Sequence, residues 1–360
     1  MMGLKKIISI MLILTTSILI SCTKMEKNEE AMLDLFDVLK GRTLAKEYLL
    51  NISKGDITSA NELCDNELIS NNVNLSEGVS KLASFQLDET ISGNDFSYFI
   101  FNVIRDSNVE PKSDLENYII RVNRAGDKYT ISSVKATSKR ELYTKNKALR
   151  IIGEKGGKSS LVISLNNIPK DTYLRNNKVM LYKEKVPNDN FGKVVLGFTG
   201  QKVAISTINE KDAYICVVYI DDTLMESGTD EISPGTPSES ASLAEIEDIM
   251  EKPVSRKVVS VDLLNNCKIE DFIFSKEDDN LAVNYKNEAG INRLNIYKTE
   301  DGELIESNLD GKFSKEVYNV KANYFEDENL NFTVYKNDNS KDNLTGVYDI
   351  NIKSLEITKL

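Results

Sequence analysis

The chain has 360 residues, which is long enough for two or three domains of ~100–200 residues each. Hydrophobic residues make up 41% of it and charged residues 28%, the composition of an ordinary folded globular protein. The 45 basic and 56 acidic residues give a formal net charge of −11, and repulsion from phosphate groups argues against nucleic acid as a partner. Because the sequence contains no histidine, catalytic sites of the Ser-His-Asp or Cys-His type, histidine general bases and histidine metal ligands are excluded.

Residues 1–22 have the organisation of a secretory signal peptide. Lys5 and Lys6 form a short positively charged region, and an uncharged, mostly apolar stretch follows at residues 7–20. That stretch is shorter than the ~20 apolar residues that a membrane-spanning helix needs. The four residues 19–22, Leu-Ile-Ser-Cys, then resemble the lipobox of bacterial lipoproteins.

The lipobox resemblance implies that the chain is cleaved before Cys22 and that the Cys22 thiol carries diacylglycerol. Residues 1–21 are then the signal peptide, and residues 22–31 are a lipidated polar tether. The alternative is an ordinary signal peptide, or a short anchor, that ends in cysteine by chance. On the lipoprotein interpretation the membrane is a partner through the N-terminal anchor, and the protein lies on the extracytoplasmic face of the cell membrane.

Three cysteines remain after Cys22, namely Cys64, Cys216 and Cys267. Their number is odd, they lie far apart in the sequence, and no Cys-x-x-Cys motif is present. Neither a disulfide framework nor a cysteine metal site is therefore indicated, and we expect isolated buried thiols.

The part that follows the tether, residues 32–138, begins with a predicted helical region. Apolar residues at helical spacing indicate helices at 32–39 and 43–54, with Gly41 as a kink or break between them and Gly55 as the end of the second. The residues able to cap a third short helix are Asp56 and Thr58.

Strand-like runs follow these helices and close with a hairpin whose turn is Gly126-Asp127. Helices followed by an antiparallel sheet predict an α+β domain. The strand-like runs are residues 96–105, 117–124 and 129–135.

This order of elements resembles the NTF2-like, or cystatin-like, superfamily. The resemblance implies a cone-shaped cavity between the sheet and the helices, in a spacer or binding module. The Asp–His pair of the enzymatic members has no counterpart, because the chain has no histidine. The residues that carry the resemblance are Ala45, Tyr48, Gly55, Asp56, Ala60, Leu63 and the hairpin 125–131.

Residues 141–220 show no convincing helix, and their short strands with turn residues between them predict a β-sandwich of the immunoglobulin-like kind. Residues 221–255 then hold ten acidic residues, one basic residue and three of the six prolines, which predicts an acidic linker. The strands expected before the linker are residues 148–152, 160–165, 178–183, 193–198, 202–207 and 213–220.

Residues 256–360 are again strand-rich and contain eight strand-like runs. Residues 280–285 resemble residues 330–335, and residues 274–282 resemble a strand pair of TolB-type β-propeller blades, without the turn glycine. Two blades do not close a propeller, which typically has four to eight. We therefore favour a single antiparallel meander or sandwich over an incomplete propeller.

One loop in this part has the spacing of a calcium-binding loop. Its candidate ligands are Asp338, Ser340, Asp342 and Asp349. The glycine that such a loop needs at its turn is replaced by Asn343, and the final glutamate is replaced by Asp349. We therefore expect a polar hairpin loop with at most weak calcium binding, and we assign no metal and no other cofactor.

Taken together, the patterns predict a multidomain, mainly β protein: an N-terminal α+β domain of NTF2-like type, followed by antiparallel β modules. With no reactive constellation in the sequence, we expect a non-catalytic binding or scaffold protein of the cell envelope. Its partner would be an envelope protein or polymer. Two alternatives stay open, an envelope hydrolase that uses a pair of carboxylates and a small-ligand receptor for a transporter.

The role of Cys22 as the lipid anchor is testable by Cys22→Ala. We expect the variant to leave the membrane fraction or to remain unprocessed, because the thiol that accepts the lipid is gone. Metabolic labelling with a radioactive fatty acid and membrane fractionation measure this outcome. Unchanged labelling of the variant, with processing that is insensitive to globomycin, would contradict the lipoprotein interpretation.

Overall fold

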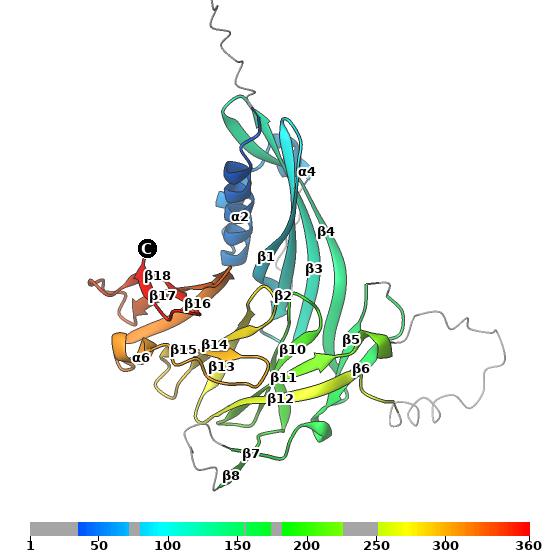
Figure 1. The fold of residues 1–360 in the computed structure, drawn as a ribbon, viewed down its shortest axis with the longest axis vertical. Helices are drawn as coiled ribbons and strands as arrows, with labels where there is room; N and C mark the ends of the chain where they lie inside the picture. The colour runs from blue at the N-terminus through cyan, green and yellow to red at the C-terminus, as the bar shows by residue number, and fades with distance from the viewer. Residues whose placement is uncertain (1–34, 72–79, 155, 174–181, 226–250) are drawn as a thin grey trace, which may run out of the picture.

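The computed structural model describes residues 35–71, 80–154, 156–173, 182–225 and 251–360 (Figure 1). Antiparallel β-sheets make up most of the described chain, and a small group of helices lies near its N-terminal end, so the mainly β fold class is confirmed. Within the described ranges, no helix has the length and apolar character needed to cross a membrane. Cys22 and most of the acidic linker lie outside the described residues.

The principal helix is α2 (Val38–Lys54), and its ends follow from local chemistry. The Asp37 side chain accepts hydrogen bonds from the backbone N–H groups of Leu39 and Lys40. Gly55 closes the helix with a φ of 75°, as predicted, because glycine enters the left-handed region without steric cost. The expected kink or break at Gly41 is wrong: the helix runs through it.

Gly41 serves packing instead. A Cβ at this position would collide with the rings of Phe36 and Phe99, so the absence of a side chain lets α2 approach the sheet closely. Two short helices, α3 (Ile57–Glu62) and α4 (Asn66–Asn71), follow. The Asp56 side chain caps α3 as predicted, by accepting from the backbone N–H of Ser59.

The helices cover one face of a six-stranded antiparallel sheet, whose longest strand has 18 residues and continues past the helices into the lower part of the molecule (Figure 1). The predicted domain boundary at residues 138–141 falls inside this strand, so the chain is not divided there. The strands in order are β1 (Ser80–Ser92), β2 (Phe96–Ser107), β3 (Lys112–Ala125), β4 (Lys128–Lys145), β5 (Ala148–Ile152) and β6 (Ser160–Ser164).

Aromatic side chains fill the space between α2 and this sheet. Phe36 meets Phe99 with ring centroids 6.5 Å apart, and Phe85 meets Phe101 at 5.8 Å in an edge-on arrangement. Phe99 and Phe101 are completely buried. The volume that the NTF2-like resemblance assigns to a cavity is therefore largely occupied by core side chains.

Three further antiparallel meanders follow, each with its strands in sequence order. The first comprises β9 (Asn190–Leu196), β10 (Lys202–Ile208), β11 (Ala213–Ile220) and β12 (Ser255–Leu264). The second comprises β13 (Lys268–Phe274), β14 (Asn280–Lys286) and β15 (Asn292–Lys298). The third comprises β16 (Tyr318–Glu326), β17 (Asn329–Lys336), β18 (Gly346–Asn351) and β19 (Ile357–Lys359), and the short helix α6 (Leu309–Lys312) precedes it. A small ribbon of β7 (Asp171–Tyr173) and β8 (Lys183–Lys185) lies at one end.

This arrangement differs from the predicted β-sandwich and C-terminal domains in two respects. The strands between residues 141 and 220 do not form a sandwich of their own, because β5 and β6 extend the N-terminal sheet whereas β9–β11 start the first meander. The eight expected strands of residues 256–360 are present, but they belong to three sheets. The first of them, β12, pairs with β11, so the acidic segment is an insertion within one sheet.

The weak repeat seen in the sequence corresponds to equivalent strands. Residues 280–285 lie in β14 and residues 330–335 in β17, and each is the second strand of its meander. Meanders of this kind are the building unit of β-propeller blades. The first strands of the three meanders lie together, because β9 contacts β13 and β13 contacts β16. The six-stranded sheet completes a ring of elements, because β3 contacts β9 and β1 contacts β16.

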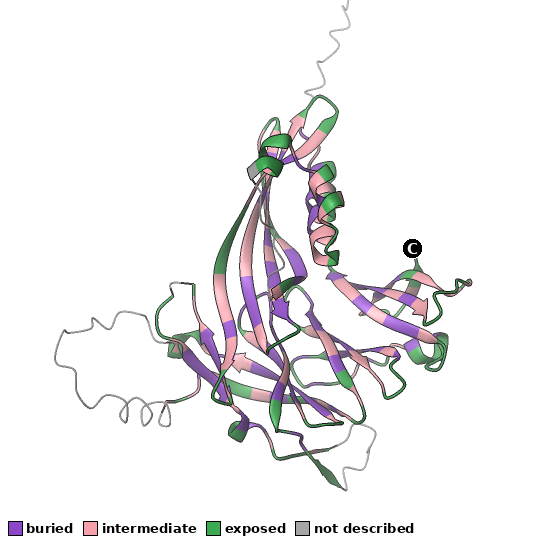
Figure 2. Cartoon of the chain, turned by 180° about the vertical axis from the view of Figure 1, so that it is seen from behind, coloured by how far each residue is buried: buried purple, intermediate pink, exposed green. Residues whose placement is uncertain are grey.

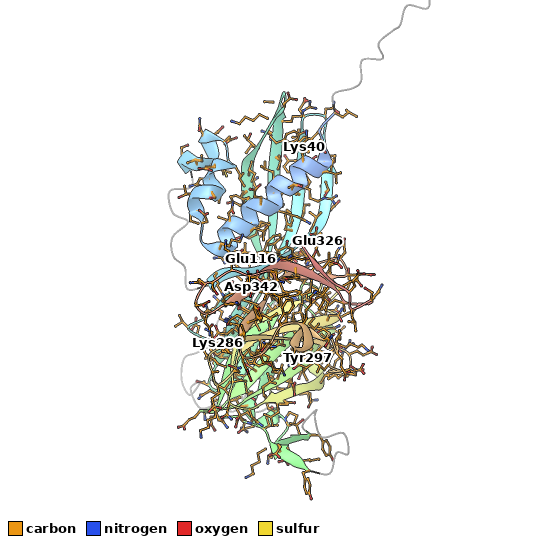
Figure 3. The ribbon with its side chains drawn as sticks, turned by 90° about the vertical axis from the view of Figure 1, so that its left-hand side faces the viewer. Lys40, Glu116, Lys286, Tyr297, Glu326 and Asp342 are labelled. Carbon is orange, nitrogen blue, oxygen red and sulfur yellow. The ribbon has the colours of Figure 1, made fainter. Side chains whose placement is uncertain are left out.

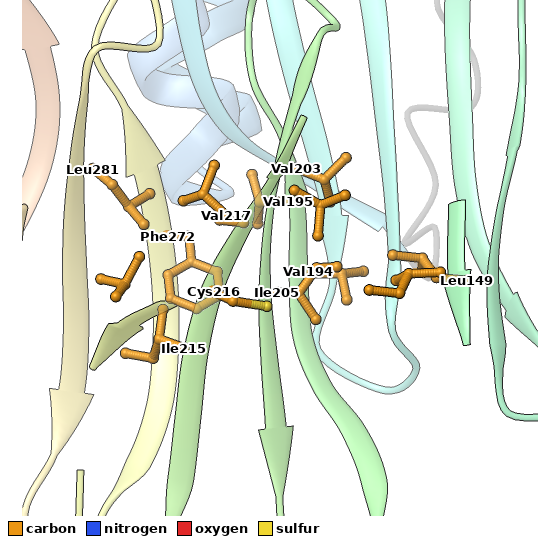
Figure 4. Packing of buried hydrophobic residues seen from close by; sticks show 14 of the residues in the cluster. Leu149, Val194, Val195, Val203, Ile205, Ile215, Cys216, Val217, Phe272 and Leu281 are labelled. Atoms are coloured by element: carbon orange, nitrogen blue, oxygen red, sulfur yellow. The ribbon is translucent and has the colours of Figure 1, made fainter. Parts of the chain in front are cut away.

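One hydrophobic core joins the lower half of the six-stranded sheet to the first two meanders. Figure 4 shows Leu149 of β5, Val194 of β9, Ile205 of β10, Cys216 of β11 and Phe272 of β13 within it. The view coloured by burial shows buried positions along the strands at this junction, whereas many of the turns are exposed (Figure 2). The first two meanders therefore pack with the lower half of the N-terminal sheet, whereas the third meander shares a separate core cluster with the second.

A buried carboxylate ties the first meander to the second. Asp278, in the turn between β13 and β14, is 0% exposed and accepts hydrogen bonds from the backbone N–H groups of Phe198 and Thr199, at 2.7 and 3.0 Å. These two donors belong to the β9–β10 turn. Burial raises the pKa of Asp278 from 3.8 to about 6, although the bonds from Thr199 and Phe198 oppose the rise.

Replacing Asp278 by asparagine tests whether its pKa is raised in the folded protein. Because the folded pKa lies above the unfolded one, the stability that Asp278 contributes is fully present below pH 3.8 and is lost as pH rises through about 6. We expect the stability difference between wild type and Asp278→Asn to fall by ~2 kcal/mol from pH 4 to pH 7. Urea unfolding followed by circular dichroism measures it, and a difference that is constant with pH would show that Asp278 has no raised pKa.

Candidate functional site

A cleft lies between the helical end of the molecule and the third meander. It consists of two adjoining hollows of about 260 and 400 Å3, and both are lined by Leu50 of α2 and Tyr324 of β16. We call the smaller one the Arg42 hollow and the larger one the Lys81 hollow, and together they are the α2–β16 cleft. In Figure 3, Glu326 of β16 is labelled just below α2, at this boundary.

One face of α2 forms a wall of the cleft. Arg42, Lys46, Leu50 and Lys54 follow each other at intervals of four residues, which places them in a row on one side of a helix. Arg42 and Lys46 line the first hollow, Lys54 lines the second, and Leu50 lines both. The helix thus offers three basic side chains and one apolar contact to whatever lies opposite.

The other walls are strand edges. Successive residues of a strand point to opposite faces of its sheet, so a hollow lined by consecutive residues faces the edge of the strand. Strand β1 lines the cleft with Lys81, Leu82, Ala83, Phe85, Gln86 and Leu87. Strand β16 lines it with Lys321, Ala322, Asn323, Tyr324, Phe325 and Glu326.

The outer edge of β1 is the more open of the two. In the part of the chain that the structure describes, β1 pairs only with β2, and its outer edge forms no backbone hydrogen bond with another strand. The edge of β16 is partly occupied by amide side chains. Asn284 donates to and accepts from the backbone of Ala322, at 3.0 and 2.8 Å, and Gln86 donates to the carbonyl of Phe325 at 2.7 Å.

The cleft is basic although the chain is acidic. Its lining holds six basic side chains and three acidic ones, an excess of three positive charges in a chain of net charge −11. The basic residues are Arg42, Lys46, Lys54, Lys81, Lys276 and Lys321. The acidic residues are Asp271, Glu326 and Asp327.

Asp271 of β13 is shared by several lysines. Its Oδ1 lies 3.6 Å from the Nζ of Lys81 and 3.4 Å from that of Lys193, and its Oδ2 lies 3.7 Å from the Nζ of Lys321. One carboxylate thus faces three ammonium groups that come from β1, β9 and β16. These distances are longer than a strong charge-assisted hydrogen bond, which has ~2.7–2.9 Å.

A second carboxylate, Asp106 of β2, completes this cluster from inside the protein. It is 0% exposed, and its Oδ2 lies 2.6 Å from the Nζ of Lys193, whose side chain is 7% exposed. Burial raises the pKa of Asp106, and the neighbouring Lys193 ammonium opposes that rise. Asp106, Asp271, Lys81, Lys193 and Lys321 therefore form one charge cluster, whose outer side opens into the Lys81 hollow.

Three basic side chains of the cleft have no acidic partner in the described part of the chain. Among the residues that the structure describes, Arg42, Lys54 and Lys276 make no ion pair within 4.0 Å. The Nε of Arg42 is buried and has no hydrogen-bond partner there. Lys46 is paired with Glu326. The positive charge of the cleft is thus only partly neutralised by the protein itself.

The candidate calcium ligands are held by other contacts. Asp342 pairs with Lys336 at 2.6 Å, accepts from the Tyr318 hydroxyl at 2.6 Å and accepts from two backbone N–H groups. The hydrogen bonds from Lys336 and Tyr318 hold the pKa of Asp342 well below its usual range. Asp349 accepts from Asn331, and Asp338 accepts from the N–H of Ser340. In the described ranges, no three or more Cys, Asp or Glu side chains are grouped as metal ligands would be.

The three described cysteines are free, and Cys64 and Cys216 are buried as predicted, whereas Cys267 is half-buried. Burial raises the pKa of the Cys216 thiol to about 12, so this thiol remains protonated at neutral pH. Cys22, the predicted lipid attachment site, lies outside the described residues, and its role stays a prediction.

No sequence pattern identified the residues that line the cleft as a group. The row Arg42, Lys46, Leu50 and Lys54 was present as a helical spacing of four, which is the signal that could have revealed it. Strand β1 was missed, because register shifts between Leu82 and Ser84 and between Leu87 and Glu89 break the alternation by which strands are recognised.

Comparison with solved structures gives weak similarity to TolB and to other β-propeller folds. Hsv2 of Kluyveromyces lactis has 11% identity and a TM-score of 0.28, and the match covers 72% of this chain and 71% of that one. The β-propeller domain of Cps50 (Swd1) from Myceliophteria thermophila has 9% identity and a TM-score of 0.27, with 72% and 81% covered. TolB from Acinetobacter baumannii has 8% identity and a TM-score of 0.23, with 69% and 63% covered. No protein-family model and no curated protein matches the chain.

Removing the charge of Lys193 should destabilise the fold strongly, because Lys193 is the counter-ion of the buried Asp106. Lys193→Met leaves Asp106 buried without its counter-ion, and we expect a loss of ~3–5 kcal/mol in the free energy of unfolding. The loss should decrease as the pH is lowered from 8 to 5, because burial raises the pKa of Asp106 and the protonated carboxyl carries no charge. Urea unfolding followed by circular dichroism measures both values.

The double variant Asp106→Asn/Lys193→Met should recover part of the loss, because it no longer buries a lone charge. The control is Lys268→Met, whose side chain is 81% exposed and pairs with Glu270 at 3.4 Å. It should change stability by less than ~1 kcal/mol. Equal losses for the Lys193 and Lys268 variants would show that the ion pair does not stabilise the fold.

Proposed function

We propose that this protein is a non-catalytic binding protein of the cell envelope, tethered to the membrane through Cys22, and that the α2–β16 cleft is its binding surface. The observation that carries the proposal is a basic cleft between strand edges in an otherwise acidic chain. Binding surfaces are concave and concentrate one sign of charge where the partner carries the other.

A binding role has more support than the hydrolase alternative. A glycosidase-like mechanism needs two carboxylates that both reach the substrate. Three carboxylates line the cleft, but Glu326 is paired with Lys46 and belongs to the Arg42 hollow, whereas Asp271 belongs to the Lys81 hollow. Asp271 is itself surrounded by three lysines, which is typical of a structural ion-pair network.

The transporter-receptor alternative has less support for a different reason. It would place a small ligand in the cone between α2 and the six-stranded sheet. That space holds Phe85, Phe99 and Phe101, which belong to the same core cluster as Tyr48 and Leu49. The α2–β16 cleft lies at the border of this core and is open to larger partners.

The tether proposal fits the position of the first described helix. Residues between Cys22 and Val38 span at most ~55 Å when fully extended, at ~3.3–3.6 Å per residue. A lipid at Cys22 would therefore keep the folded part, and with it the cleft, close to the membrane surface. The partner is then a protein or polymer found in that layer of the envelope.

Site-specific photo-crosslinking tests the proposal in intact cells. Val347 lines the Lys81 hollow and is 39% exposed, whereas Val317 is 44% exposed and does not line the cleft. With benzoylphenylalanine at position 347, we expect a discrete crosslinked product, because the bound partner lies against this residue. The same group at position 317 is the matched control, since both positions are valines of similar exposure.

Purification and mass spectrometry of the crosslinked product identify the partner. A product of the same size and yield from both positions would indicate non-specific collision. If position 347 gives no product under conditions where the protein is folded and at the membrane, the cleft is not a binding surface.

A further inference from the structure

The chemistry of the cleft also indicates the class of its partner. We propose that the α2–β16 cleft takes an extended acidic peptide segment of a partner protein, with carboxylates in both hollows and its backbone against the outer edge of β1 on either side of the Gln86–Phe325 hydrogen bond. This inference rests on the proposed function, because it requires the cleft to be a binding surface.

The positions of the unneutralised charges define two carboxylate sites. In the Arg42 hollow, Arg42 and Lys276 have no ion-pair partner among the described residues, and the buried Arg42 Nε lacks an acceptor. In the Lys81 hollow, Lys54 is free of ion pairs in the same ranges, and Asp271 is shared by Lys81 and Lys321 at 3.6 and 3.7 Å. A carboxylate in either place would face basic groups that the protein leaves partly uncompensated.

The spacing of these sites fits an extended peptide. Arg42 and Lys54 are twelve residues apart on α2, which at ~1.5 Å per residue is ~18 Å along the helix axis. An extended chain rises ~3.3 Å per residue, so acidic groups about five residues apart would reach both hollows.

The edge of β1 favours a peptide over an anionic glycan. Its outer side makes no backbone hydrogen bond to another strand in the described part of the chain, and six of its residues line the cleft. An added strand supplies alternating N–H and C=O groups that match such an edge, whereas a sugar chain does not. The chain also lacks tryptophan, the side chain best suited to stacking on sugar rings.

The middle of the cleft is less charged than its two ends. Leu50 and Tyr324, which are common to both hollows, provide apolar contact at the middle of the proposed peptide. Lys46 is neutralised by Glu326, so it adds little charge of its own. The proposed ligand is therefore a short acidic strand with an uncharged centre.

Fluorescence anisotropy with the full chain in detergent tests the proposal. The probe is a labelled peptide with two Glu-Glu pairs separated by Ser-Thr-Val, and its control has Gln in place of Glu. We expect the Glu peptide to bind at least about tenfold more tightly, and the difference to shrink in 0.5 M salt, because the contacts are ionic. Equal binding of the two peptides would overturn the proposal.

Charge-reversal variants locate the binding. Arg42→Glu/Lys276→Glu changes two groups that have no ion-pair partner among the described residues, and we expect about a tenfold loss of affinity for the Glu peptide. The matched control is Lys40→Glu/Lys128→Glu, which changes the net charge equally at exposed positions outside the cleft lining (Figure 3 labels Lys40). Similar losses in both variants would overturn the assignment to the cleft. Circular dichroism checks that both variants are folded.

Two further probes test the strand-edge and peptide parts separately. The Glu peptide with N-methyl groups at alternate residues cannot pair fully with β1, and undiminished binding of it would overturn the contact with this edge. A polyuronate oligomer of the same charge represents a glycan, and tighter binding of it, lost in Arg42→Glu/Lys276→Glu, would overturn the peptide in favour of an anionic glycan. A crosslinked product at position 347 without peptide binding would leave the proposed function standing and reject only this inference.

Discussion

The buried ion pair between Asp106 and Lys193 lies where all the principal sheets of the structure meet. Asp106 belongs to β2 of the N-terminal sheet and Lys193 to the first strand of the first meander. Asp271, on the first strand of the second meander, is shared by Lys193, by Lys81 of β1 and by Lys321 of β16. Five strands thus contribute one charged residue each. Charges buried in this way are tolerated only when they are mutually compensated, so the cluster favours one relative placement of the sheets over others.

The same cluster links the fold to its surface. On the inner side, Asp106 and Lys193 compensate each other away from water, whereas on the outer side the lysines around Asp271 exceed the available negative charge. An anion that binds there would neutralise groups that the folded protein alone leaves in repulsion. Because such a ligand binds the folded form only, it would also stabilise the junction of the sheets by mass action. Occupancy of the cleft by an anion would therefore be coupled to the stability of the sheet junction through Asp271.

Elements governed by local chemistry could be predicted from the sequence, whereas their assembly could not. The Gly55 helix end, the Asp56 cap and the strands Ala148–Ile152 and Ala213–Ile220 follow from residue type and periodicity, and the structure has them. The pairing of β11 with β12 across the acidic segment depends on contacts between residues far apart in the chain, which no local pattern contains. Strand β1 was hidden by its bulges, and with it one wall of the cleft. The charge cluster could not be predicted either, because its five residues lie on different strands and come together only in the folded structure.

The continuity of β4 has a consequence for how this architecture can change in evolution. Recombination preserves folding where few contacts cross the point of exchange, and such points usually separate domains. Lys128–Lys145 is instead one strand that pairs with β3 along its length and with β5 near its end. A crossover in the middle of it would leave half-length partners on either side and expose unpaired edges of β3 or β5. We therefore expect the helical part and the meanders to tolerate separation at β4 poorly, whereas the turns and the segment between β11 and β12 interrupt no strand.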